Sequence, residues 1–194
     1  MSESKDTFNV SLLGPTNLPR FSAVTGLGMD KIRALAETTG KAIAGSSATL
    51  TVVFNYGGML KLVGDAHKTA GGTLRMLYTE KGTSDDWETV PYEPHLKEAD
   101  EVQKLKSWHA MLLSLVSDAD VVVCAGLSSG VLAELAYIKW NAMEKRGRVK
   151  KLIGIKELLR GGEFPPEIAT DLNDLIEIVP VAEMGKTLAL WKNR

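Results

Sequence analysis

The sequence predicts an α/β protein of Rossmann-like architecture, a three-layer sandwich in which helices cover both faces of a mainly parallel sheet. Short apolar or β-branched runs alternate with longer segments whose apolar residues recur at helical spacing. The runs at 49–54 and 121–124 are of the kind found in strands buried on both faces of a parallel sheet. The length of 194 residues suits one domain, so we expect residues 1–194 to form a single Rossmann-like domain.

Strand and helix alternate in the first half of the chain. Asp30 is a favourable N-cap, and the glycine and serines at 45–47 end the helix that follows it. Glycines at 57–58 and 71–72 bound a second helix, which makes 49–78 a predicted βαβ unit. The predicted elements are a strand at 8–13, a loop at 14–20, a helix at 30–45, a strand at 49–54, a helix at 59–69 and a strand at 73–78.

The second half continues this alternation after a long loop. Residues 81–94 combine Gly, Ser, Asp and Pro with two aromatic residues, which predicts a structured surface loop of the kind that often forms a lid. Apolar residues at helical spacing from Val102 to Val116 predict one long helix over 96–116. The remaining predictions are a strand at 121–124, a loop at 125–130, a helix at 131–144, strands at 152–155 and 175–179, and a closing helix at 182–191.

Composition and charge argue against several classes of protein. With 23 basic and 24 acidic residues the net charge is −1, and no Lys/Arg stripe could neutralise a nucleic-acid backbone. The single cysteine, Cys124, lies in an apolar run, which excludes a disulfide framework and favours a buried thiol. His, Cys and carboxylate residues do not cluster at ligand spacing, so neither a metal site nor a cofactor is predicted. No stretch approaches the roughly 20 apolar residues of a membrane span, and we expect a cytoplasmic protein.

Three strand-to-helix turns carry the candidate ligand site. In a doubly wound sheet, ligands bind outside the carboxyl ends of the strands, where turns offer unpaired backbone amides. Glycine permits close approach of an anion, serine hydroxyls donate hydrogen bonds, and the helix macrodipole favours negative charge. An ordinary N-cap and tight turns would explain the third turn equally well. The predicted phosphate- or nucleotide-binding residues are Gly14, Pro15 and Thr16 in the first turn, Asn55, Gly57 and Gly58 in the second, and Gly126, Leu127, Ser128, Ser129, Gly130 and Val131 in the third.

Glu134 is the candidate for acid–base chemistry. It lies one turn into the helix that follows the third turn, so its carboxylate can project beside a ligand held at the helix N-terminus. An acid near the start of a helix also complements the macrodipole without any chemical role. The sequence position alone leaves both interpretations open.

Residues 56–72 form one block of glycine-bearing sequence, and residues 117–123 with 126–134 form a second. These blocks resemble the LOG-like (Lonely Guy) family, long mislabelled as lysine decarboxylases. Residues 56–72 resemble its G-G-x-x-G-L-M-x-A-v-x-x-G-A-x-x-A-G-G segment. Residues 117–123 are similar to the family's S-D-A strand, and 126–134 to its P-G-G-x-G-T-x-x-E loop and helix. Its members are Rossmann-like phosphoribohydrolases that cleave the base from cytokinin riboside monophosphates. Related proteins of the SLOG superfamily bind nucleotides or carry the molybdenum cofactor.

The resemblance implies catalytic positions and also shows departures. Glu134 matches the family's essential glutamate, and His109 stands where the family has its catalytic arginine. A histidine at the edge of an apolar helix stripe would explain His109 without catalysis. Val131 replaces the family's threonine, which leaves Ser128 and Ser129 as the hydroxyl donors of the turn.

Two functions remain open from the sequence. The first is a nucleoside 5′-monophosphate phosphoribohydrolase, in which the third turn holds the phosphate and Glu134 activates water or stabilises the ribosyl cation. The alternative is a non-enzymatic nucleotide sensor or molybdenum cofactor carrier that keeps the pocket. A dinucleotide dehydrogenase is disfavoured because no G-x-G-x-x-G follows the first strand. The expected partner is a small phosphorylated molecule, and the resemblance implies a homodimer.

Overall fold

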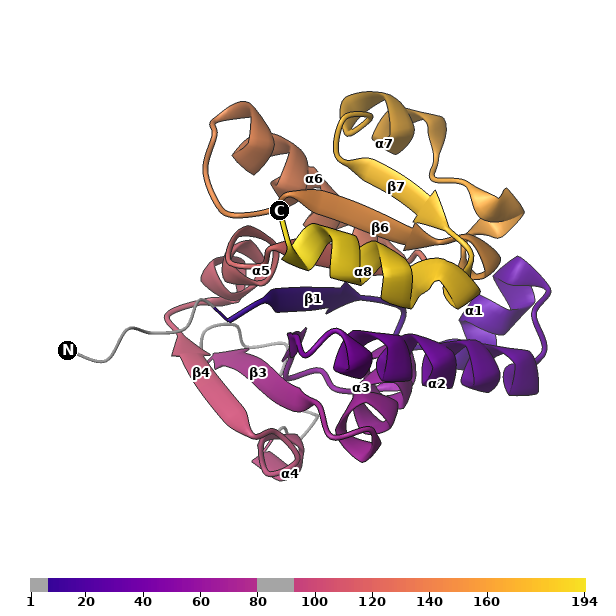
Figure 1. The fold of residues 1–194 in the computed structure, drawn as a ribbon, viewed down its shortest axis with the longest axis horizontal. Helices are drawn as coiled ribbons and strands as arrows, with labels where there is room; N and C mark the ends of the chain where they lie inside the picture. The colour runs from indigo at the N-terminus through magenta and orange to yellow at the C-terminus, as the bar shows by residue number, and fades with distance from the viewer. Residues whose placement is uncertain (1–6, 80–92) are drawn as a thin grey trace.

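The chain is described by a computed structural model that covers residues 7–79 and 93–194. The described residues form one seven-stranded sheet in which all neighbouring strands are parallel, in the order β4-β3-β2-β1-β5-β6-β7 (Figure 1). The predicted α/β, Rossmann-like fold is confirmed. The predicted loop at 81–94 lies outside the described residues, except for its last two positions.

The strands are β1 (Asn9–Leu13), β2 (Thr49–Val53), β3 (Thr73–Thr79), β4 (Glu101–Leu105), β5 (Val121–Cys124), β6 (Lys151–Ile155) and β7 (Ile176–Val179). The α-helices are α1 (Leu18–Thr25), α2 (Met29–Gly45), α3 (Gly58–Thr69), α4 (Glu93–Leu96), α5 (Trp108–Ser117), α6 (Ser129–Met143), α7 (Pro166–Asp171) and α8 (Met184–Lys192). The connections in the described part of the chain contain the short 3₁₀ segments η2 (Lys156–Leu158), η3 (Arg160–Gly162) and η4 (Val181–Glu183).

Helices cover both faces of the sheet. Helices α2, α3 and α8 pack together on one face, and α5 and α6 pack together on the other. Figure 1 shows α2 and α8 in front of the strands and α6 behind β6. The steps from β1 to β2 and from β5 to β6 run in opposite directions along the sheet, so right-handed crossovers place their helices on opposite faces. The central strands β1, β2 and β5 are therefore buried along their whole length.

The predicted single helix over 96–116 is wrong. Residues Glu101–Leu105 form β4, an edge strand that pairs with β3, and α5 begins only afterwards. The Ser107 side chain accepts a hydrogen bond from the amide of Ala110 (3.2 Å) and caps α5, which separates the helix from the strand. Four of the five β4 residues are exposed. This edge strand therefore lacks the apolar run by which buried strands are recognised.

The predicted loop at 14–20 is wrong in its second half, because α1 begins at Leu18. The Asn17 side chain accepts a hydrogen bond from the amide of Arg20 (3.0 Å) and caps the helix. Pro19 occupies the first turn, where a missing N–H leaves no helical hydrogen bond unmade. The same Gly, Pro and Asn residues that indicated a loop therefore serve to start a helix.

His67 is a fully buried histidine in the contact between α2 and α3. Its Nε2 atom lies 3.0 Å from the carbonyl oxygen of Thr73. Burial lowers the pKa of His67, and this effect exceeds the opposing effect of the nearby backbone carbonyls. The neutral imidazole is thus the form that the folded protein accommodates.

The contribution of His67 to the free energy of unfolding should therefore decrease as the pH falls below about 6.5, the ordinary pKa of histidine in an unfolded chain. The folded-state pKa is the lower one, so the unfolded state takes up the proton first and is favoured in acid. In urea titrations at pH 7 and pH 5, the free energy of unfolding of His67→Gln should change less unfavourably toward acid than that of the wild type, because the variant lacks this contribution. His109→Gln, at an exposed histidine, is the matched control for the loss of an imidazole. An identical pH slope in all three proteins would contradict the assignment.

Candidate phosphate-binding site

The candidate site lies where the order of the strands reverses. The chain continues from β1 toward β2 on one side, whereas β5, the other neighbour of β1, continues toward β6 on the opposite side. The connections that leave the carboxyl ends of β1 and β5 therefore diverge, and a crevice opens between them. In this protein the crevice is bounded by α1 on one side and by the N-terminus of α6 on the other.

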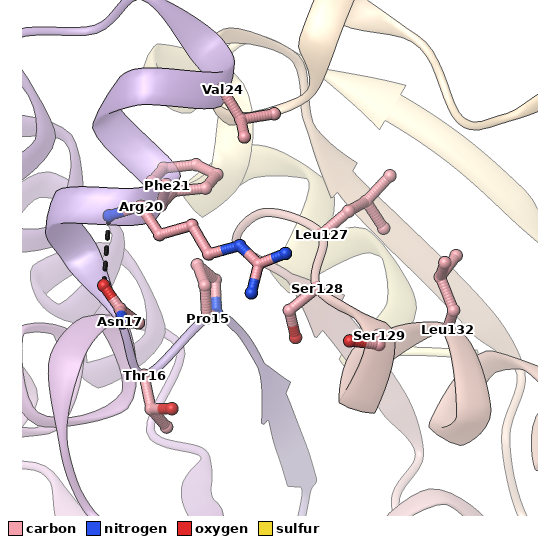
Figure 2. A pocket seen from close by; sticks show the side chains of 10 residues that line it. All are labelled: Pro15, Thr16, Asn17, Arg20, Phe21, Val24, Leu127, Ser128, Ser129 and Leu132. Atoms are coloured by element: carbon pink, nitrogen blue, oxygen red, sulfur yellow. Dashed lines mark hydrogen bonds between the residues drawn. The ribbon is translucent and has the colours of Figure 1, made fainter.

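A cavity of about 360 Å³ occupies this crevice. Its volume falls in the range of roughly 300–1,000 Å³ that is usual for small-molecule sites. Figure 2 shows the hydroxyl-bearing side chains of Thr16, Ser128 and Ser129 in the lower part of the view, with apolar side chains above them. The residues that line the cavity are Pro15, Thr16, Asn17, Arg20, Phe21, Val24, Leu127, Ser128, Ser129 and Leu132.

The N-terminus of α6 opens into the cavity. Ser128 is the N-cap, and its Oγ accepts a hydrogen bond from the amide of Val131 (3.3 Å). Within the described part of the chain, the amides of Ser129 and Gly130 have no acceptor. They are the unpaired donors of the first helical turn, and the macrodipole adds partial positive charge there. Val131 itself is buried and its amide is already bound, so this predicted position does not present a free donor.

Arg20 supplies the positive charge of the site. Its guanidinium extends from α1 toward the turn that precedes α6 (Figure 2). Among residues 7–79 and 93–194, no carboxylate pairs with it. A guanidinium that faces helix amides and serine hydroxyls across a cavity is suited to an anion with several oxygens, because it can donate two parallel hydrogen bonds.

Two glycines allow the three predicted turns to meet around Pro15. Gly126 has a φ of +115°, and a Cβ there would lie 2.7 Å from the ring of Phe21. Gly58 has a φ of +54°, and a Cβ there would overlap the backbone of Thr16. The amide of Met59 donates to the carbonyl oxygen of Pro15 (2.9 Å), which ties α3 to the same turn.

The structure thus separates the predicted binding residues into two groups. Pro15, Thr16, Leu127, Ser128 and Ser129 line the cavity. The other predicted residues are not among those that line it. They are Gly14, where a Cβ would lie 3.0 Å from Met59, Asn55 and Gly57 in the turn before α3, Gly58 against the backbone of Thr16, and Gly126, Gly130 and Val131 next to the serines.

Glu134 is partly buried and has no hydrogen-bond or ion-pair partner in the described part of the chain. Burial raises the pKa of its carboxyl to about 7. A group with this pKa can both accept and donate a proton near neutral pH. Glu134 is not one of the residues lining the 360 Å³ cavity. Burial is the main cause that raises the pKa of the Cys124 thiol to about 12, and the negative charge of Glu134 raises it further. The thiol is therefore inert as a nucleophile.

His109 lies in the first turn of α5 and is exposed. The preceding residue, Trp108, packs edge-on against the ring of Phe54 at a centroid distance of 5.9 Å. His109 does not line the cavity. The structure therefore places both residues of the predicted catalytic pair, Glu134 and His109, outside the wall of this cavity.

Several features of the site were not predicted from the sequence. Arg20 ends the predicted turn at 14–20, but the sequence predicts no site role for it, nor for Phe21 and Val24. The spacing of the three residues after the Asn17 cap is that of one helix face. Leu132, which also lines the cavity, is predicted only as part of a helix. In the described residues, no three His, Cys, Asp or Glu side chains converge to hold a metal ion. None of the described helices combines the length and apolar character needed to span a membrane.

No protein-family model and no curated protein matches the sequence. Solved structures do match. The chain is similar to the molybdenum cofactor carrier protein of Chlamydomonas reinhardtii, with 16% identity and a TM-score of 0.67 over 97% of this chain and 99% of that one. It is also similar to the molybdenum cofactor binding protein of the phototrophic bacterium Rippkaea orientalis, with 17% identity and a TM-score of 0.67 over 98% and 100% of the two chains. At these identities the likeness shows a shared fold.

Proposed function

We propose that this protein binds a phosphorylated small molecule in the cavity between α1 and α6 and holds it without chemical change, as a nucleotide sensor or a cofactor carrier. One observation carries the proposal. A single cavity brings together the amide of Ser129, two serine hydroxyls and the guanidinium of Arg20, and within the described part of the chain neither that amide nor the guanidinium has a partner. These groups are all hydrogen-bond donors, and they converge at a helix N-terminus, where a phosphate group is stabilised.

The molybdenum cofactor is a specific candidate, because proteins that carry or bind it share this fold. It consists of a phosphate-bearing pterin whose own sulfur atoms hold the metal. The cavity offers what such a molecule requires of a protein: Arg20, Ser128 and Ser129 for the phosphate, and apolar side chains for the ring system. The protein would supply orientation and protection from water, while the bound cofactor would supply any redox chemistry.

Thermal unfolding with candidate ligands tests this proposal. A ligand at about 100 times its Kd stabilises the folded state by roughly 2.7 kcal/mol, which corresponds to a rise in Tm of about 5–10 °C for a chain of this length. We expect such a rise with AMP or with a pterin monophosphate, and no released base or other product. The absence of a shift with every phosphorylated ligand, at concentrations up to the millimolar range, would argue against the proposal.

A second candidate function is hydrolysis of the N-glycosidic bond of a nucleoside monophosphate, as the likeness to the LOG-like family suggests. The unpartnered carboxyl of Glu134, with a pKa raised to about 7, favours it. As a general base, Glu134 would accept a proton from water as the water attacks the ribosyl carbon.

Glu134→Gln should abolish any release of free base from AMP, measured by chromatography, because the amide cannot accept that proton. In the wild type the rate should rise with pH through about 7, as the carboxyl ionises. Glu144→Gln, at the exposed C-cap residue that follows α6, is the control and should retain full activity. Activity that survives Glu134→Gln would remove this residue from the mechanism.

We also propose a homodimer that pairs through α6. Trp140 and Met143 are 59% and 63% exposed on this helix, which is unusual for large apolar side chains. Light scattering should give a molar mass of about twice 21.0 kDa for the wild type, and about 21.0 kDa for Trp140→Glu. A monomeric wild type would contradict the proposal.

A further inference from the structure

A second, much smaller cavity lies between α5 and the sheet. Its volume is about 10 Å³, which is enough for about one water molecule. Asp118 and Ala119 line it shortly before β5 begins, whereas the α1–α6 cavity lies after β5 ends. The two cavities therefore lie at opposite ends of the sheet, and no described residue lines both of them.

The sheet contributes a row of polar side chains to the small cavity. Ser11, Thr51 and Arg75 lie in register on β1, β2 and β3, so they face the same side of the sheet. The next residues on that side of the same strands are buried and apolar. They are Leu13, Val53 and Leu77. Polar groups kept inside a core of this kind need hydrogen-bond partners.

The hydroxyl groups of Ser11 and Thr51 are buried at this cavity. The two residues are only 1% and 6% exposed. Among the described residues, no protein group forms a hydrogen bond with either hydroxyl. A buried hydroxyl without a partner is unfavourable, because it has lost its hydrogen bonds to water. The cavity is the space from which one partner can reach both hydroxyls.

The charges around the cavity favour a neutral occupant. Arg75 lines it with a guanidinium whose Nε lies 2.7 Å from Oε2 of Glu101. Asp118 lines it with a carboxylate that accepts a hydrogen bond from Ser117 (3.0 Å). An anion would meet the carboxylate, and a cation would meet the guanidinium. Water avoids both conflicts, since it donates and accepts hydrogen bonds.

We infer that this cavity is a binding site for one ordered water molecule, which Ser11 and Thr51 hold from the sheet and Asp118 holds from the end of α5. The water bridges two central strands to this helix and completes the hydrogen bonds of the two buried hydroxyls. The inference is independent of the proposed function, because it concerns the opposite end of the sheet.

A high-resolution crystal structure of the full chain, from a crystal soaked in bromide, tests the site directly. We expect one water oxygen within about 2.6–3.2 Å of Ser11 Oγ and Thr51 Oγ1, without anomalous signal from bromide. Bromide in the cavity would overturn the inference in favour of an anion. Hydroxyls that bond to protein groups around a dry cavity would overturn it as well.

A double-mutant cycle tests whether one molecule serves both hydroxyls. Ser11→Ala and Thr51→Val should each lower Tm by about 2–4 °C, because each removes one partner of the water and leaves the other hydroxyl buried. The double variant should lower Tm by no more than the larger single change, because no buried hydroxyl then remains without a partner. Two effects that simply add would contradict a shared water.

Thr39→Val is the matched control for the loss of a buried hydroxyl. Thr39 lies on α2, which packs on the other face of the sheet, and its hydroxyl donates to the carbonyl oxygen of Leu35 (2.8 Å). Combined with Ser11→Ala, its effect on Tm should add, since the two sites share no partner. If this pair is as non-additive as Ser11→Ala with Thr51→Val, the coupling is general to the fold and the inference fails.

Discussion

Arg20→Glu is expected to weaken the binding of a phosphate monoester by about 100-fold or more. The substitution removes charge-assisted hydrogen bonds worth roughly 1.5–3 kcal/mol and places a negative charge beside the phosphate. Because Arg20 is exposed and has no ion-pair partner in the described structure, its loss should cost little stability. Titration calorimetry with AMP measures the effect directly.

Arg33→Glu is the control for the change in net charge. Arg33 lies on α2, where it pairs with Asp30 at 3.1 Å and does not line the cavity. This variant has the same net charge as Arg20→Glu. If AMP affinity depends on the contact between Arg20 and the phosphate, and not on net charge, the affinity of Arg33→Glu should stay within about twofold of the wild type. Equal weakening in both variants would indicate a general charge effect and would remove Arg20 from the site.

Gly58→Ala is expected to have the largest effect on stability, a loss of about 2–4 kcal/mol. The residue has a φ of +54°, which costs an L-residue about 1–2 kcal/mol, and the new Cβ would overlap the backbone of Thr16. The loss should lower Tm by roughly 5–15 °C. Because the overlap moves Thr16 away from Ser128 and Ser129, ligand affinity should fall as well.

Gly57→Ala provides a matched control one residue away. Gly57 has a φ of −135°, which any residue adopts, and a Cβ there would meet nothing within 4 Å. We expect its Tm and its AMP affinity to match those of the wild type. If both variants behave alike, the close approach of α3 to Thr16 does not hold the site together.

The fold was predictable because its central strands are buried on both faces. The segments that form β1, β2 and β5 are rich in apolar and β-branched residues, and this composition indicates a buried strand without knowledge of which strands pair with it. The edge strand β4 carries no such signal, since its exposed residues Val102 and Lys104 are as compatible with a helix surface. Its strand conformation comes from pairing with β3, a contact between segments far apart in the sequence.

The candidate site was predictable only in part. Glycines and serines after strands indicate backbone amides near a ligand, and Ser128 and Ser129 do line the cavity. Arg20 and Val24 belong to the site because α1 folds over the third turn, which depends on the packing of Phe21 against Gly126. A single sequence does not encode that contact in any local pattern. For the same reason, the sequence could not show that Glu134 lies outside the cavity wall.

The central claim is that the phosphate of the ligand lies on the amides that open α6. Titration of ¹⁵N-labelled protein with AMP, followed through the backbone amide resonances, tests it most directly. The largest saturable shifts should fall on Ser129 and Gly130, and they should disappear in Arg20→Glu. Unmoved resonances at these two residues, with the largest changes elsewhere in the protein, would contradict the claim.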